Sequence, residues 1–193
     1  MTATSNATVE AADAILVAAA RGGDLFAWEH LVRRYQEPVY RVAFLIVRDT
    51  ALAEEATQSA FVRAWRALPS LDEGHGLLPW LFRITAGEAR QQRRDSGRPR
   101  HSSRPVERIK GPHYPASAVP GLAAAAGLSH VERERVSSAF DRLGEEDRLT
   151  IASRYLFGLS RADAASALAV SARVLDAHLL TALQNLRARM TAA

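Results

Sequence analysis

Apolar residues recur at intervals of three and four positions through the first half of the chain, which is the spacing of an amphipathic helix rather than of a strand. Asp24 and Asp49 stand where helix N-caps are expected. Pro38 lies inside the second apolar pattern, where it predicts a kink or a break. Four helices are therefore predicted, over residues 9–21, 25–47, 50–68 and 78–94.

The helical pattern fails between residues 96 and 128, where prolines, glycines and serines predict an extended linker. A second helical block follows the linker. Ser129 and Glu132 have the spacing of a capping box, and Gly158 is expected to close a helix as its C-cap. Helices are predicted over residues 129–143, 145–157, 160–168 and 172–190.

The last two predicted helices are joined by residues 169–171. A short helix, a tight turn and a longer helix are typical of a helix-turn-helix, although an ordinary helical hairpin fits the periodicity equally well. A linker as long as 96–128 is uncommon inside one compact domain. We therefore predict an all-α fold with two small helical domains, 9–95 and 129–191, joined by that linker.

Positive charge is concentrated in one stretch of the chain. The 193 residues have a formal net charge of +4 and a pI of about 10.1, and the segment from Arg83 to Lys110 alone is +6. Clustered arginine is the electrostatic signature of phosphate binding, because each contact releases condensed counterions. The alternative is compositional, since codon bias in a GC-rich bacterium also explains why all basic residues except Lys110 are arginine.

Several classes of function lack the residues they need. The absence of cysteine excludes disulfides, thiol catalysis and Cys-ligated zinc. The six histidines are scattered singly, and no Ser, His or carboxylate cluster has catalytic or metal-ligand spacing. We expect no enzymatic activity, cofactor, metal or small-molecule substrate. The apolar run 14–20 is too short to span a bilayer and has no basic flank, so a cytoplasmic protein without membrane insertion is expected.

Motifs in a fixed order carry a family resemblance. They are GDLFAWEHLVRRY at 23–35, AEEATQSAFVRAW at 53–65, PWLFRI at 79–84, and a C-terminal frame of Leu143, Arg148, Tyr155, Gly158, Leu159, Ser160, Ala165, Leu168, Val170 and Ser171. The chain thereby resembles the extracytoplasmic-function (ECF) sigma factors of the sigma-70 superfamily. The resemblance implies a transcription initiation factor that binds core RNA polymerase, directs it to promoters and assists DNA opening, without being an enzyme.

The resemblance assigns polymerase docking to the third predicted helix. The candidate residues there are Glu54, Glu55, Gln58, Phe61 and Trp65. Spacings of three and four bring these positions onto adjoining faces. The family's partner surface is the clamp helices of the largest polymerase subunit, with the flap region as a further expected contact. For Phe61 and Trp65 the alternative is a purely structural role in the core.

The loop and helix that follow correspond to the part of the family that reads the minus-10 promoter element and holds a flipped base. The candidate residues are Asp72, Glu73, His75, Trp80, Arg83, Arg90, Gln91, Arg93 and Arg94. The arginines are expected to hold phosphates, with a solvated face as the alternative. The chain departs from the family pattern at Gly87, where Asn is usual, and at Gln91, where Asp is frequent. The minus-10 contacts therefore need not follow the family's in detail.

The C-terminal domain corresponds to the family's minus-35 reader. The candidate residues are Arg161, Ser171, Arg173, Asp176, His178, Thr181 and Gln184. The exposed face of the last helix has fewer basic residues than a major-groove helix usually carries. Two hypotheses follow: the helix reads an unusual minus-35 element, or its exposed Ala177 and Leu180 meet a protein such as an anti-sigma factor or an activator.

Other expectations concern the linker and rival functions. The linker resembles the segment that threads the RNA exit path of the polymerase, and a plain tether is its alternative. A stand-alone helix-turn-helix regulator and a degenerate sigma-like protein that does not initiate transcription are the rival functions. Control is expected from outside the chain, through an anti-sigma factor, expression level or proteolysis.

Overall fold

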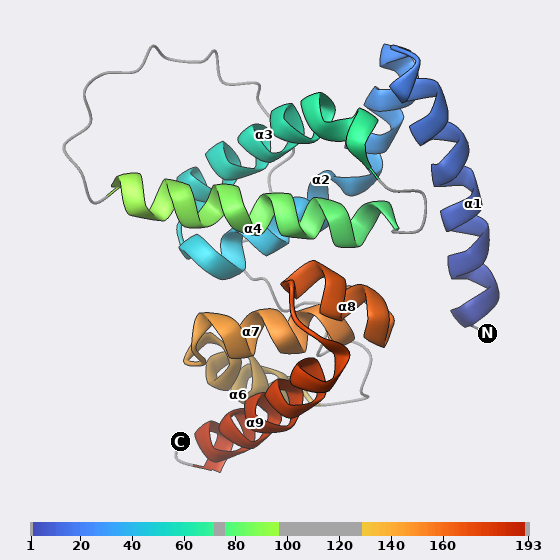
Figure 1. Cartoon of the computed structure of the whole chain (residues 1–193). Coiled ribbons are helices and arrows are strands. Elements are labelled where there is room, and N and C mark those ends of the chain that lie inside the picture. The colour runs from blue at the N-terminus through green and yellow to red at the C-terminus, as the bar shows by residue number, and fades with distance from the viewer. Residues whose placement is uncertain (1, 72–75, 97–128, 192–193) are drawn as a thin grey trace.

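The computed structural model describes residues 2–71, 76–96 and 129–191, with side chains from residue 12 onward. The described residues are helical, with no strand among them. The elements are α1 (Thr2–Arg21), α2 (Leu25–Val47), α3 (Thr50–Ala67), η1 (Leu68–Ser70), α4 (Leu77–Ser96), α6 (His130–Asp141), α7 (Glu145–Ile151), η2 (Ala152–Leu156), α8 (Arg161–Leu168) and α9 (Ala172–Thr191). Figure 1 shows α1–α4 as one block and α6–α9 as a second block beneath it.

Helices begin where the sequence places capping residues. The Asp24 carboxylate accepts hydrogen bonds from the backbone N–H groups of Phe26 and Ala27, and Asp49 caps α3 in the same way. Ser129 and Glu132 form both bonds of a capping box at the start of α6. These caps satisfy backbone N–H groups that have no partner inside the helix, which is why a local sequence pattern predicts them.

Two helices depart from the prediction. The first helix begins at Thr2 rather than at residue 9. Pro38 does not break α2, which continues from Leu25 to Val47. A proline removes one backbone hydrogen bond from a helix interior. The turns after Pro38 are nevertheless fixed by burial, because Val39, Tyr40 and residues 42–46 are all buried.

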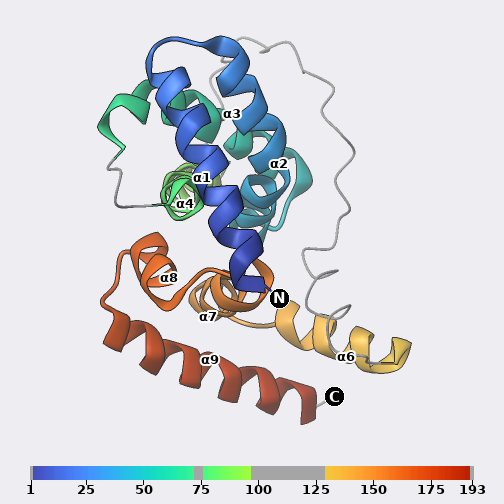
Figure 2. The same cartoon turned by 90° about the vertical axis from the view of Figure 1, so that its right-hand side faces the viewer.

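The N-terminal block has a core to which each of its four helices contributes. Leu31 and Val39 of α2 pack with Ala60 and Ala64 of α3 and with Leu81 of α4. The first helix is fixed to the second by polar contacts as well as apolar ones. The buried Asp13 carboxylate accepts hydrogen bonds from Tyr35 and Arg34. Figure 2 shows α1 lying along α2, with α4 seen end-on behind it.

The C-terminal block contains the predicted helix-turn-helix. Helices α8 and α9 meet at 90° across a three-residue turn. Ala169 opens the turn in the left-handed region with φ of 56°, and Gly158 does the same before α8 with φ of 61°. Leu175 and Ala182 are buried on the side of α9 that packs against α6 and α7.

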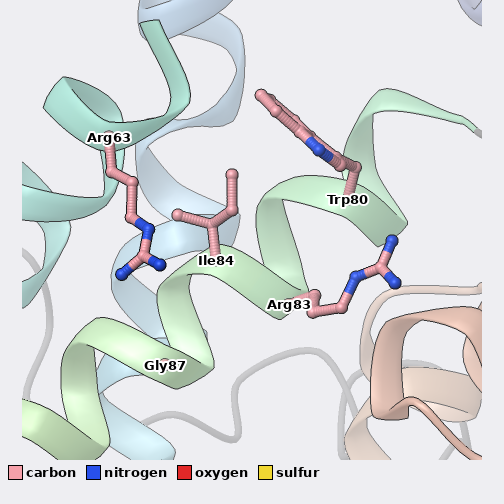
Figure 3. Close-up of a pocket in the computed structure, with 5 residues that line it drawn as sticks. All are labelled: Arg63, Trp80, Arg83, Ile84 and Gly87. Atoms are coloured by element: carbon pink, nitrogen blue, oxygen red, sulfur yellow. The ribbon is translucent and has the colours of Figure 1, made fainter. Parts of the chain in front are cut away.

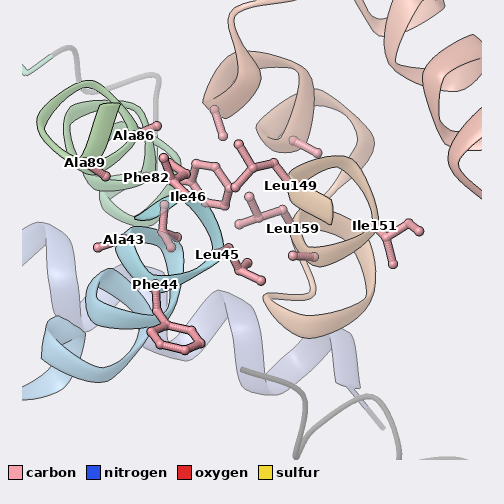
Figure 4. Close-up of a cluster of buried hydrophobic side chains, with 14 of the residues drawn as sticks. Ala43, Phe44, Leu45, Ile46, Phe82, Ala86, Ala89, Leu149, Ile151 and Leu159 are labelled. Carbon is pink, nitrogen blue, oxygen red and sulfur yellow. The ribbon is translucent and has the colours of Figure 1, made fainter. Parts of the chain in front are cut away.

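The two blocks share one apolar cluster. Ile46 of α2 and Phe82 of α4 point towards Leu149 of α7, as Figure 4 shows. Phe82 also meets Phe157 edge to face, with ring centroids 5.6 Å apart. The sequence predicts two helical domains joined by a linker, and the structure adds a packed contact between them.

Candidate polymerase and nucleic-acid interfaces

The predicted docking residues divide into an exposed group and a supporting group. Glu54, Glu55 and Gln58 are exposed on α3. Phe61 and Trp65 are half-buried, and both contact the Trp28 ring of α2, at centroid distances of 6.2 Å and 5.3 Å. Such ring pairs stabilise the packing of α3 on α2. The polar residues thus form a rigid, solvent-facing row, and the aromatic residues hold the helix that carries it.

The arginines of α4 fall into two groups, one that is exposed and one that pairs with the C-terminal block. Arg83 and Arg94 are exposed, and the Arg94 guanidinium donates to Gln91 at 2.6 Å. Arg90 and Arg93 instead donate to the two carboxylate oxygens of Glu145 in α7, at 2.7 Å and 2.5 Å. The arginine-rich end of α4 therefore meets an acidic residue of the other block.

A groove of about 220 Å³ lies between α3 and α4, lined by Arg63, Trp80, Arg83, Ile84 and Gly87. Figure 3 shows the side chains of Arg63, Trp80, Arg83 and Ile84 and the position of Gly87 on α4. Trp80 is 9% exposed, so its ring belongs mainly to the core. A Cβ atom built on Gly87 would meet nothing within 4 Å, which leaves the α4 backbone accessible from the groove. The sequence marks Gly87 only as a departure from the family pattern and does not mark Arg63 at all, because no local pattern shows that α3 and α4 meet there.

The predicted minus-10 loop residues Asp72, Glu73 and His75 lie outside the described residues, as does the predicted linker 96–128 except for Ser96, which is the last residue of α4. Leu71 and Gly76, which flank the loop, are described. Gly76 directly precedes α4, which carries the groove-lining Trp80.

The predicted minus-35 residues lie on or beside α9. Ser171 accepts a hydrogen bond from the Val174 N–H at the start of the helix, and Arg173, Thr181 and Gln184 are exposed. His178 is half-buried, with Nδ1 3.0 Å from a Glu146 carboxylate oxygen. Arg173, Thr181 and Gln184 lie along the exposed side of α9, as the periodicity predicts.

Asp176 is paired with Arg161 across the turn. Two guanidinium nitrogens of Arg161 contact the carboxylate, at 3.0 Å and 2.5 Å. The hydrogen bond from Arg161 lowers the pKa of Asp176, and the same bond raises the pKa of Arg161. The positive charge of Arg161 is thereby partly neutralised on the face where a phosphate would approach.

Other kinds of site are missing from the described part of the chain. It holds no group of three or more His, Cys, Asp or Glu side chains that could bind a metal ion. None of the described helices is by itself long and apolar enough to cross a membrane. Among them, only α8 and α9 taken together, across their 90° bend, reach that length and apolar composition.

Comparison with known proteins decides the family. A family model described as Sigma-70 region 2 matches residues 31–99, which span most of α2 together with α3 and α4. The ECF RNA polymerase sigma-E factor of Escherichia coli is 31% identical over 153 residues, which cover 77% of this chain and 78% of the relative. The chain belongs to the ECF RNA polymerase sigma factors. The ECF sigma factor is thus a transcription initiation factor whose partners are core RNA polymerase and promoter DNA.

Further relatives match this ECF sigma factor over nearly its whole length. The RNA polymerase sigma factor NccH of Alcaligenes xylosoxydans xylosoxydans is 28% identical over 180 residues, covering 93% of each chain. The solved structure of CnrH in complex with the cytosolic domain of CnrY matches with a TM-score of 0.66 and 26% identity, covering 94% of this chain and 98% of that one. CnrH is a sigma factor of Cupriavidus metallidurans. Both helical blocks therefore have counterparts in the family.

Proposed function

We propose that this ECF sigma factor docks on the clamp helices of the largest polymerase subunit through Glu54, Glu55 and Gln58 of α3. The observation that carries the proposal is the exposure of all three polar side chains on a helix whose opposite side is buried. Phe61 and Trp65 support the interface by fixing α3 against Trp28. A rigid helix loses little conformational entropy on binding, which favours such a surface for docking.

Binding to core RNA polymerase tests this role of α3. Replacing Glu54 and Gln58 together with alanine removes two polar contacts without touching the core, and we expect a loss of affinity of about tenfold or more. The matched control is Glu134→Ala on α6, which is exposed and lies in the other block. Equal affinity of the double variant and the control for core polymerase would place docking elsewhere.

We further propose that α4 and the loop before it bind the minus-10 element. The exposed Arg83 and Arg94, together with Arg90 and Arg93, supply phosphate contacts along one helix. The groove beside Gly87 offers an accessible backbone at the same place. Asp72, Glu73 and His75 of the loop, and Gln91 of the helix, would contribute contacts to bases.

For α9 we propose recognition of a minus-35 element through Arg173, His178, Thr181 and Gln184, with Arg161, Ser171 and Asp176 positioning the start of the helix. The second candidate function is contact with a protein, and it is favoured by the 65% exposure of Leu180 and the 40% exposure of Val174. The pairing of Arg161 with Asp176 also weakens the positive field of this face.

The double variant Arg173→Ala and His178→Ala separates these two functions. Under minus-35 recognition we expect promoter affinity of the holoenzyme to fall about tenfold, since each lost base contact costs about 1–3 kcal/mol. Arg135→Ala, an exposed arginine of α6, is the charge control. If the double variant binds promoter DNA as tightly as the control does, the exposed face of α9 contacts a protein partner rather than the minus-35 element.

We infer that an anti-sigma factor is the protein partner of this chain. The solved relative CnrH is in complex with the cytosolic domain of CnrY, and its arrangement of helices is similar over 94% of this chain. We also propose that the protein has no enzymatic activity of its own and works in the cytoplasm, where core polymerase and promoter DNA are found.

A further inference from the structure

Glu145 connects the C-terminal block to the arginines of α4. Its two carboxylate oxygens are divided between two partners, Oε1 accepting from Arg90 Nε at 2.7 Å and Oε2 from Arg93 Nη1 at 2.5 Å. Arg93 also donates to the backbone carbonyl of Ile46 at 3.2 Å, which holds its guanidinium in place. One acidic residue at the start of α7 thus neutralises two of the four arginines of α4.

The apolar contact between the blocks fixes this arrangement. Ile46 and Phe82 pack against Leu149, one turn of α7 beyond Glu145 (Figure 4). Arg148 is buried, and its Nε donates to the Leu45 carbonyl at 3.1 Å. The position of Glu145 therefore depends on the docking of the whole C-terminal block and not on a mobile surface side chain alone.

Arg90 and Arg93 stabilise the ionised form of the Glu145 carboxyl. Burial acts to raise the pKa of the carboxyl, but hydrogen bonds and charge from Arg90 and Arg93 outweigh it, so the pKa of Glu145 is lowered. Two guanidinium groups three residues apart on a helix present parallel donors to one anion, and a phosphodiester has the same charge and a similar spacing of oxygen atoms. What these arginines do for a carboxylate they can do for a DNA phosphate.

We propose that Arg90 and Arg93 form a phosphate site which the Glu145 carboxylate occupies in the free chain, so that promoter DNA and the C-terminal block compete for this end of α4. The proposal rests on the proposed binding of promoter DNA by α4. Glu145 acts as an internal substitute for phosphate, and the site opens when the two blocks separate.

The competition has a quantitative consequence. When only a fraction of a protein is in the binding-competent state, its apparent affinity for the ligand is reduced in proportion to that fraction. DNA that binds only the state with separated blocks shifts the equilibrium towards that state, because it has no affinity for the packed one. The packed contact between the blocks therefore lowers the affinity of the free factor for DNA.

The first test measures binding of the full-length protein to a fluorescein-labelled 20-nucleotide oligothymidine by anisotropy. Glu145→Gln keeps the shape of the side chain and removes its charge, and we expect affinity to rise about three- to tenfold, as the loss of two partly exposed ion pairs implies. The slope of log affinity against log salt is expected to steepen by about 0.7 for each additional phosphate that the variant binds.

The matched control is Glu134→Gln, an exposed acid that loses the same charge and whose ion-pair partner, His130, lies on its own helix α6. We expect it to bind the oligonucleotide as the unaltered chain does at 0.15 M salt, since exposed charges beyond about 8 Å are screened. Glu145→Asp keeps the charge and is expected to stay within twofold of the unaltered chain. Equal affinities for Glu145→Gln and Glu134→Gln would overturn the proposal.

The second test follows the distance between the blocks. The chain has no cysteine, so a dye pair on Ala51→Cys in α3 and Ser138→Cys in α6 reports only their separation. We expect one short-distance population in the free protein, and longer distances in Glu145→Gln or with saturating oligothymidine. An unchanged distance at saturation would mean that DNA and the C-terminal block do not compete.

Failure of this inference is distinguishable from failure of the proposed function. A chain that initiates transcription with core polymerase, but whose Glu145→Gln variant behaves as Glu134→Gln, lacks the internal competition and keeps its role as a sigma factor. A chain whose oligothymidine affinity is unchanged by replacing Arg83 and Arg94 with alanine does not bind DNA through α4, and the proposed use of that helix is then wrong.

Discussion

Ala169 holds the backbone of the helix-turn-helix in a conformation that an L-residue rarely adopts, with φ of 56° and ψ of 40°. This conformation lets the N–H groups of Ala169 and Val170 bond to the carbonyls of Ser166 and Ala165, which closes α8. A left-handed residue other than glycine costs about 1–2 kcal/mol. The turn between α8 and α9 is therefore made at the expense of local strain.

Replacing Ala169 with glycine is expected to stabilise the protein. The substitution relieves the strain at φ 56°, and part of this stabilisation is offset by the greater freedom of glycine in the unfolded chain, so we expect a net increase of about 0.5–1 kcal/mol in the free energy of unfolding. Urea denaturation measures that free energy. Ala188→Gly in the exposed part of α9 is the control and should lose about 0.8–1 kcal/mol. A destabilised Ala169→Gly protein would show that the strain argument is wrong.

The sequence singles out Arg148 only as one of the C-terminal residues that resemble the ECF sigma factors. Its side chain is 8% exposed and donates to the carbonyls of Leu45 and Leu143. Burial, and then the nearby charge of Arg48, lower the pKa of its guanidinium. No local pattern distinguishes this buried arginine from the exposed arginines of α4, because its partners lie in another block.

At the scale of the element, α4 combines a buried face with an arginine-bearing face and a glycine in its middle. Phe82 and Ala89 are fully buried, while Arg83 and Gly87 face solvent along the groove. Gly87 has no positive φ, and its position leaves room for a Cβ. Neither backbone conformation nor packing explains the glycine, and we infer that the space beside it serves the DNA strand that α4 is proposed to bind.

Gly87 therefore predicts opposite changes in stability and in DNA binding. Gly87→Ala should stabilise the protein by up to about 1 kcal/mol through helix propensity. Gly87→Leu should be at least as stable as the unaltered chain, but fills the groove and lowers the affinity of the holoenzyme for promoter DNA about tenfold or more. Thermal unfolding and promoter binding measure the two effects.

Ser138→Leu on α6 is the control for an added exposed leucine, and its promoter affinity should be unchanged. If Gly87→Leu binds promoter DNA as tightly as this control does, then the groove beside α4 takes no part in binding.

The sequence predicts the elements well where their causes are local. Caps at Asp24, Asp49 and Ser129 are confirmed, because each acts on backbone groups within three residues. Local patterns fail where tertiary burial outweighs propensity. Pro38 remains inside α2, and η2 adopts the wider π-helix that periodicity does not distinguish from an α-helix.

At the scale of the whole molecule, the unpredicted feature is the contact between the blocks. Arg148 and Leu45 are 103 residues apart, and Arg90 and Glu145 are 55 apart. Apolar periodicity shows that a helix has a buried face but does not show which helix covers it. The candidate site residues on α3 and α9 are largely exposed, as their spacing predicts, whereas two arginines of α4 are held by Glu145.

Transcription in a purified system tests the central claim, that this chain is a sigma factor which uses α3 to engage the polymerase. Core RNA polymerase is combined with the protein on the DNA upstream of its own gene and on genomic fragments. We expect specific transcripts that depend on the protein and that disappear when Glu54 and Gln58 are both replaced with alanine. Core polymerase that is bound by the protein but yields no transcript from any fragment would contradict it.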